Sequence, residues 1–221
     1  MNQPLQLKVC GLTQINQIQE LISLNTDFLG FIFYKKSPRY VLNHLNLEDL
    51  FKINHSGKVG VFVNEDVGKV AEIVKKGGLN FIQLHGDENE DYILELRKKT
   101  GNSIKIIKVL RIGTDPFSSN KKYIDSIRSV QQYVNYLLFD TDSQSFGGTG
   151  KQFGWSLLNE FELQIPYFLS GGISEENVMN IKNLHQKPFA LDINSKFETE
   201  PGVKNIEKVR LFQSNLTNSN L

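Results

Sequence analysis

The sequence predicts an α/β protein built as a single (β/α)₈ barrel, and three observations lead there. Eight short apolar runs recur along the 221 residues, with segments of helical spacing between them. Most runs are continuous rather than alternating, which is typical of parallel strands covered on both faces. Polar and glycine-rich segments follow the ends of the runs, and in a barrel these ends meet at one face. A long doubly wound sheet is the alternative architecture.

The predicted elements alternate in order along the chain. The strands span 5–10, 28–33, 58–63, 79–84, 104–110, 134–139, 166–169 and 188–193, and the helices 13–24, 66–76, 88–99, 115–131, 174–183 and 204–211. In the first helix Ile15, Ile18, Leu21 and Ile22 form one apolar stripe, and Thr13 is the predicted N-cap. Between 37 and 53, only residues 47–53 have a helical pattern.

The domain organisation follows from the length. Eight units in 221 residues leave roughly 28 residues each, near the lower end for such barrels, so a second domain has no room. No linker or composition break divides the chain. We therefore predict one barrel domain over residues 1–212 and a polar, asparagine-rich tail over 213–221 that frays.

Composition and charge exclude several classes of partner. Lys and Arg total 25 against 24 Asp and Glu, so no bulk charge attracts nucleic acid or an anionic membrane. The single cysteine cannot form an internal disulfide, and the first residues lack the apolar run of a signal peptide. No apolar run approaches the roughly 20 residues that span a bilayer. We expect a cytoplasmic protein that binds neither nucleic acid nor membrane.

Two titratable residues close buried strands. Cys10 is followed at once by Gly11, and Lys8 lies two residues back on the same face, where an ammonium would favour the thiolate. The alternative is a small buried core residue. Asp140 closes the run before it and is either a functional carboxyl group or a turn cap.

An anion site is predicted after the last two strands. Gly171 and Gly172 let the backbone approach an anion closely, and a predicted helix follows them. Asp192, Asn194 and Ser195 follow the next strand. Many barrels bind phosphate with these two loops.

Metal and nucleotide sites are not predicted. The four histidines, at 44, 55, 85 and 185, have no spacing that suits a metal, and His85 fits a supporting role better than direct chemistry. The segment 147–151 lacks the flanking residues of a Walker A motif, and no dinucleotide fingerprint opens a helix. We expect no cofactor, and we interpret the glycine-rich loop 141–154 as a lid.

A set of motifs in chain order resembles the phosphoribosylanthranilate isomerase family. The motifs cover nearly the whole chain and read KVCGLT at 8–13, GFIFYKKSPRY at 30–40, VGVFVN at 59–64, QLHGDE at 83–88, LFDT at 138–141, GGTGK at 147–151, SGG at 170–172 and DINSKFE at 192–198. Each motif alone is weak, but the ordered set is specific. Lys196 departs from the family pattern, which commonly has glycine there.

The resemblance implies a (β/α)₈ barrel that rearranges N-(5-phosphoribosyl)anthranilate to 1-(2-carboxyphenylamino)-1-deoxyribulose 5-phosphate in tryptophan biosynthesis, as a monomer or a homodimer. Carried over by position, the expected roles are general base for Cys10, general acid for Asp140, carboxylate binding for Arg39, phosphate binding for Gly171, Gly172 and Ser195, and a polar position at the floor of the site for Asp192. We also expect Asp192, His85 and Asn194 to contact the substrate.

The chemistry suits these residue types. Opening the sugar ring needs an acid that is protonated at neutral pH, and removing the C2 proton needs a base. Cys10 can be that base only as thiolate, so we expect its pKa to fall toward neutrality from about 8.5. Arg39 offers a forked donor set for a carboxylate. No hydride, electron or metal step is needed.

Two other functions remain open from the residues. Another phosphosugar barrel enzyme, such as an indole-glycerol-phosphate synthase or a ribulose-phosphate epimerase, would share the phosphate end but would not need both Cys10 and Asp140. A non-catalytic phosphosugar-binding barrel would merely bury Cys10.

Overall fold

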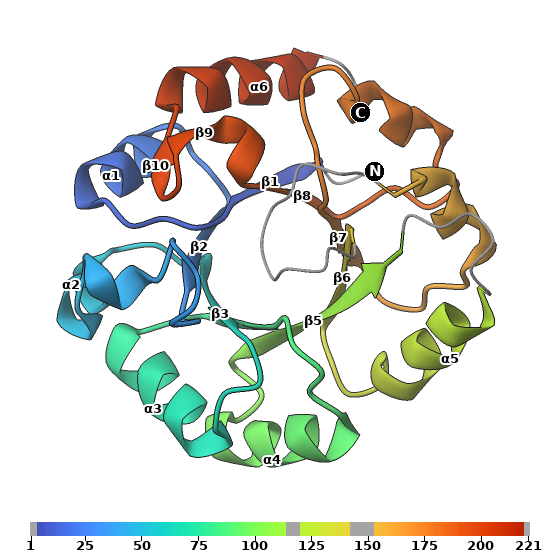
Figure 1. The fold of residues 1–221 in the computed structure, drawn as a ribbon, viewed down its shortest axis with the longest axis horizontal. Coiled ribbons are helices and arrows are strands. Elements are labelled where there is room, and N and C mark those ends of the chain that lie inside the picture. The colour runs from blue at the N-terminus through green and yellow to red at the C-terminus, as the bar shows by residue number, and fades with distance from the viewer. Residues whose placement is uncertain (1–3, 114–119, 142–152, 219–221) are drawn as a thin grey trace.

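The computed structural model describes residues 4–113, 120–141 and 153–218, in which eight parallel strands close a barrel (Figure 1). The order runs from β1 to β8, and β8 pairs with β1 through the register Gln6↔Ala190 to Val9↔Ile193. The predicted fold class is thus confirmed. The strands are β1 Gln6–Val9, β2 Phe28–Ile32, β3 Lys58–Phe62, β4 Phe81–Leu84, β5 Lys105–Ile112, β6 Tyr136–Thr141, β7 Tyr167–Leu169 and β8 Ala190–Ile193.

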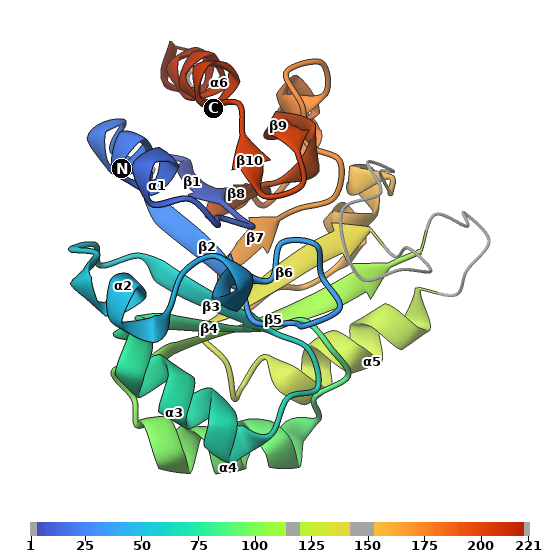
Figure 2. The ribbon, with the colours of Figure 1, turned by 60° about the vertical axis from the view of Figure 1, so that its left-hand side comes forward.

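Helices surround the barrel on the outside (Figures 1 and 2). The α-helices are α1 Ile15–Ser23, α2 Leu47–Lys52, α3 Val67–Gly77, α4 Glu90–Thr100, α5 Lys121–Val130 and α6 Ile206–Asn218. The 3₁₀ helices are η1 Val41–Asn43, η2 Trp155–Glu160, η3 Val178–Asn183 and η4 Ser195–Phe197. A short antiparallel hairpin, β9 Glu198–Glu200 with β10 Val203–Lys204, joins η4 to α6.

Aromatic side chains fill one end of the barrel interior and leave the other end for a site. Phe28, Phe81 and Tyr136 are the first residues of β2, β4 and β6, so they lie at the amino ends of the strands. Phe28 packs edge-to-face against Phe81 and Phe168 at 5.2 Å between ring centroids. A second, larger apolar layer lies between the strands and the helices. The barrel interior is therefore left for a site only at the carboxyl ends of the strands.

Several predicted boundaries are wrong. Thr13 is not the N-cap of α1: Gln14 holds that position, and the Thr13 hydroxyl donates instead to the Gly202 carbonyl at 2.7 Å. The predicted helix 174–183 is only the 3₁₀ helix η3. Residues 115–119 of the predicted helix 115–131 lie outside the described residues.

The polar tail predicted over 213–221 is wrong for residues 213–218, because α6 continues through them. Leu216 is buried there, and Gln213 donates to the Leu24 carbonyl at 3.0 Å. The polar composition of this stretch therefore did not reveal that it continues the helix and packs against the fold through Leu216 and Gln213. No helix in the described part of the chain is long and apolar enough to cross a membrane.

Candidate active site

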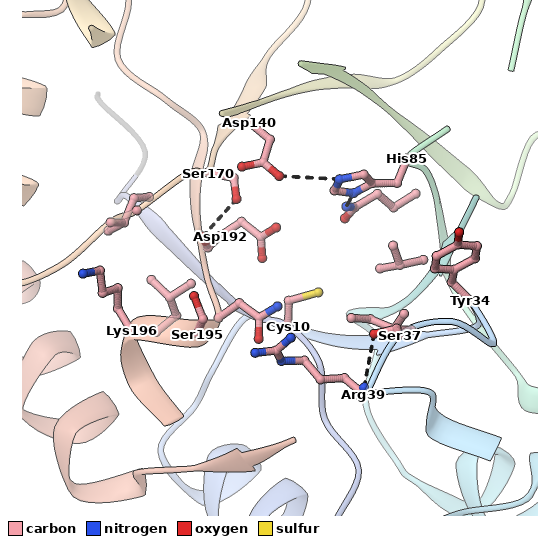
Figure 3. Close-up of a pocket in the computed structure, with 18 of the residues that line it drawn as sticks. Cys10, Tyr34, Ser37, Arg39, His85, Asp140, Ser170, Asp192, Ser195 and Lys196 are labelled. Carbon is pink, nitrogen blue, oxygen red and sulfur yellow. Dashed lines mark hydrogen bonds and ion pairs between the residues drawn. The ribbon is translucent and has the colours of Figure 1, made fainter. Parts of the chain in front are cut away.

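One pocket lies at the carboxyl ends of the strands. Figure 3 shows its side chains converging from opposite walls of the barrel. All nine residues that the sequence predicts for the site line this pocket: Cys10, Arg39, His85, Asp140, Gly171, Gly172, Asp192, Asn194 and Ser195.

A buried ion pair between Lys8 and Asp192 lies next to Cys10 and influences its charge state. Lys8 Nζ lies 2.8 Å from Asp192 Oδ1, and the Lys8 side chain is fully buried. Although burial works to lower it, Asp192 and Cys10 hold the Lys8 pKa above its usual range. Lys8 also hydrogen-bonds the Cys10 thiol and works to lower its pKa, but burial is the larger effect and the thiol pKa is raised. The expected fall toward neutrality is therefore wrong for this arrangement.

Asp140 is held by its own strand end and faces a histidine. Its Oδ1 accepts the Thr141 N–H at 2.8 Å, and its Oδ2 lies 3.5 Å from His85 Nε2 (Figure 3). Gln83 Nε2 lies 3.0 Å from His85 Nδ1 and fixes the ring from behind. Asp140 remains about a quarter exposed, so it is open to the pocket. His85 therefore lies beside the carboxyl group, with its ring held by Gln83.

The glycine turn after β7 is shaped by close packing. Gly171 and Gly172 have φ values of +85° and +71°, which side-chain-bearing residues rarely adopt. A Cβ on Gly171 would lie 2.3 Å from Thr141 Oγ1. The predicted α-helix after this turn is absent, because only η3 follows, from Val178, so no α-helix dipole supports an anion there.

The loop after β8 forms the facing wall. Ser195 and Lys196 lie in η4 and line the pocket, and Lys196 does not adopt the positive φ that glycine would permit. The Lys196 side chain is exposed at the edge of this wall. The motif 147–151 lies outside the described residues.

Arg39 reaches the pocket from the loop after β2. It is 8% exposed, and its Nε and Nη2 contact the Glu198 carboxylate at 3.0 Å and 2.6 Å. Glu198 also accepts from Lys204 Nζ at 2.5 Å. Burial works to raise the Glu198 pKa, but the bonds from Arg39 and the charge of Lys204 hold it below its usual range. Burial lowers the pKa of Lys204, against the effect of Glu198.

Sequence reasoning missed three of these residues. Glu198 and Lys204 come from the hairpin β9–β10, for which no strand pattern is readable in so short a segment. Gln83 lies within the motif 83–88, and its inward position on β4 could be read from the alternation of side chains. In the described residues no group of three or more His, Cys, Asp or Glu side chains is placed to hold a metal ion.

Comparisons with known proteins agree with one another. The family model described as N-(5'-phosphoribosyl)anthranilate (PRA) isomerase matches residues 7–215. The N-(5'-phosphoribosyl)anthranilate isomerase of Parabacteroides distasonis is 36% identical over 210 residues, covering 93% of this chain and 90% of that protein. That of Trichodesmium erythraeum is 36% identical over 230 residues, covering 96% and 97%.

Solved structures give the same result. Phosphoribosyl anthranilate isomerase from Thermotoga maritima superposes with a TM-score of 0.76 at 30% identity, over 97% of this chain and 99% of that one. A phosphoribosyl anthranilate isomerase in complex with reduced 1-(o-carboxyphenylamino)-1-deoxyribulose 5-phosphate superposes with a TM-score of 0.74 at 28% identity, over 97% and 99%.

Proposed function

The chain belongs to the N-(5'-phosphoribosyl)anthranilate isomerase family, and from its site we propose that Cys10 and Asp140 divide the proton transfers of the isomerisation. The protein is an isomerase of tryptophan biosynthesis that converts N-(5-phosphoribosyl)anthranilate to 1-(2-carboxyphenylamino)-1-deoxyribulose 5-phosphate. The observation that carries the division of roles is that both side chains line one pocket with different surroundings.

Asp140 is the proposed acid. Its carboxyl group donates a proton to the furanose ring oxygen, the C1–O bond breaks, and the nitrogen lone pair forms the C1=N bond of a protonated Schiff base. The Thr141 N–H and His85 hold the carboxyl group in place for this transfer. The pair of electrons that leaves C1 ends as the new C4 hydroxyl, so no redox partner is required.

Cys10 is the proposed base. Its thiolate removes the proton on C2, and those electrons form a C1=C2 bond while the Schiff base nitrogen becomes neutral. The resulting enolamine tautomerises, with a proton added at C1 and the C2 hydroxyl proton lost, to give the ketone. Lys8 and Asp192 fix the position and charge around the sulfur throughout. The developing positive charge of the Schiff base favours thiolate formation nearby.

Substrate binding is assigned to the two ends of the pocket. Arg39 holds the anthranilate carboxylate at one end, and the turn at Gly171 and Gly172 with Ser195 holds the phosphate at the other. Asn194 and Lys196 border the phosphate end. The ligand is thus a small phosphorylated aminosugar, and we place the protein in the cytoplasm as a monomer or a homodimer with one barrel domain.

Substitution tests the roles. Cys10→Ala and Asp140→Asn should each lower kcat by about 10²- to 10⁴-fold, the usual worth of a general acid or base. Binding of the reduced product analogue should stay within a few-fold of wild type, measured by calorimetry. Loss of substrate fluorescence reports turnover. Near-full activity of Cys10→Ala would exclude the thiolate as base and revive the interpretation of Cys10 as a packed core residue.

A further inference from the structure

Behind Arg39 lies a buried set of charges that the proposed reaction does not use. The hairpin β9–β10 brings Glu198 and Lys204 together at 2.5 Å, with side chains 4% and 0% exposed. Burying a charge away from water costs several kcal/mol unless the charge is paired and hydrogen-bonded, so a buried set of charges is expected to have a function. This set contacts Arg39, which indicates that it acts on that residue.

The Glu198 carboxylate hydrogen-bonds one edge of the Arg39 guanidinium. Nε lies 3.0 Å from each carboxylate oxygen, and Nη2 lies 2.6 Å from Oε2. A guanidinium has five N–H groups, and this contact uses those on the Nε side. The two terminal nitrogens keep N–H groups that point away from Glu198 as a parallel fork. In the part of the chain that the structure describes, Glu198 is the only hydrogen-bond partner of the guanidinium, so that fork is left for a ligand.

Arg39, Glu198 and Lys204 together carry a net charge of +1. Arg39 and Lys204 contribute two cations, and Glu198 contributes one anion. Without Lys204, the contact between Arg39 and Glu198 would be neutral overall and would attract a carboxylate weakly. Lys204 Nζ also donates to Asn194 Oδ1 at 2.7 Å, which ties the set to the wall that carries the predicted phosphate site.

The hairpin β9–β10 is held in place by α1 and by the residues just before that helix. Gln17 Oε1 accepts the Lys204 N–H at 2.8 Å, and Gln17 Nε2 donates to the Lys204 carbonyl at 2.7 Å. Thr13 donates to the Gly202 carbonyl at 2.7 Å. On the other side, a Cβ on Gly11 would lie 2.7 Å from Arg39 Cδ, so only glycine there lets Arg39 pass. Arg39 is thus confined from two sides.

We propose that Glu198 and Lys204 are positioning residues that set the enzyme's selectivity for a substrate bearing the ortho-carboxylate, by holding Arg39 with its terminal N–H fork toward that group. This inference rests on the proposed role of Arg39 in carboxylate binding. Glu198 fixes the orientation, and Lys204 preserves the positive charge. Neither residue touches the reacting atoms, so both act on recognition through Arg39.

The test compares two ligands on the full-length protein. One is the reduced product analogue with the o-carboxylate, and the other is the same compound made from aniline, which lacks it. Calorimetry gives both Kd values, and their ratio measures carboxylate selectivity without relying on turnover. The variants are Glu198→Gln, Glu198→Asp and Lys204→Met. Glu200→Gln is the matched control, because Glu200 lies exposed on the same strand β9.

Glu198→Gln and Lys204→Met should each reduce the selectivity ratio by about 10- to 100-fold, the usual effect of a misplaced binding group, while the Kd of the aniline ligand changes by no more than a few-fold. Glu198→Asp keeps the charge and should recover part of the ratio. It also serves if Glu198→Gln is too unstable to measure. Glu200→Gln should match wild type.

Two results would overturn the inference in distinguishable ways. If Arg39→Met abolishes the selectivity but the Glu198 and Lys204 variants keep it, or weaken both ligands equally, the two residues are merely structural and the role of Arg39 stands. If Arg39→Met itself leaves the ratio unchanged, the carboxylate site is elsewhere and the proposed role of Arg39 fails first.

Discussion

Replacing Gly30 by alanine should displace Cys10, the proposed base, while leaving that residue itself unchanged. Gly30 lies in β2 opposite Cys10, and an added Cβ would lie 2.8 Å from Sγ and 2.9 Å from the Cys10 Cα. Ordinary Cβ contacts begin at 3.4 Å, so the backbone at the end of the first strand must move back by about half an ångström. The Leu12 N–H donates to the Gly30 carbonyl at 3.0 Å, so this retreat strains the bond between the two segments.

We expect Gly30→Ala to lower the free energy of unfolding by about 1–3 kcal/mol, the usual cost of overpacking. Displacing Cys10 by half an ångström should lower kcat by about 10- to 100-fold. Guanidinium titration measures the first effect, and the decay of substrate fluorescence measures the second.

Gly77→Ala is the matched control for this substitution. Its Cβ would find the nearest atom, Leu79 Cγ, at 3.6 Å, and Gly77 is helical, so alanine should stabilise the protein by up to about 1 kcal/mol and leave kcat unchanged. If Gly30→Ala shows wild-type stability and kcat, the strand contact does not position Cys10.

Three further predictions concern charge and backbone. Lys8→Met removes the ammonium that works to lower the Cys10 pKa, so the rise of kcat/KM with pH and the alkylation of the thiol by iodoacetamide should both move to higher pH. The same substitution leaves the buried Asp192 carboxylate unpaired, which should lower the free energy of unfolding in urea by about 3–5 kcal/mol. Gly171→Ala forces a side chain into a φ of +85° and against Thr141, so it should destabilise the loop by about 1–3 kcal/mol and raise KM. The folded-state pKa of Glu198 lies below its ordinary 4.5, so its stabilising effect is present above pH 4.5 and is lost as pH falls through the lower value. In Glu198→Gln, the free energy of unfolding in urea should therefore fall less steeply at acid pH than in wild type. An equally steep fall would contradict this.

The position of most site residues could be predicted from local sequence. Cys10, Asp140 and Gly171 lie at or just after the end of a buried apolar run, and Asp192 lies near the end of the last run; the carboxyl ends of parallel strands must meet at one face once the barrel closes. The chain order of strands and helices therefore locates these residues without any long-range information. Their convergence in one pocket is confirmed, whereas their individual roles stay predictions.

Other features depend on contacts between distant segments. Thr13 has the residue type of an N-cap, but it bonds Gly202, which is 189 positions away, because the hairpin packs over the start of α1. The α6 helix extends through a polar stretch since Leu216 and Gln213 find partners on neighbouring elements. Local propensity cannot foresee either outcome.

The sequence by itself determined the barrel and the ring of polar residues at its mouth, because both follow from the periodicity of apolar residues and the geometry of parallel strands. Only the tertiary structure decided the electrostatic state of the site. The direction of the Cys10 pKa is a balance between burial and Lys8, and the aim of Arg39 depends on Glu198 and Lys204. Such balances are set by solvent exclusion and by distances of a few ångströms between residues far apart in the chain, which no local pattern records.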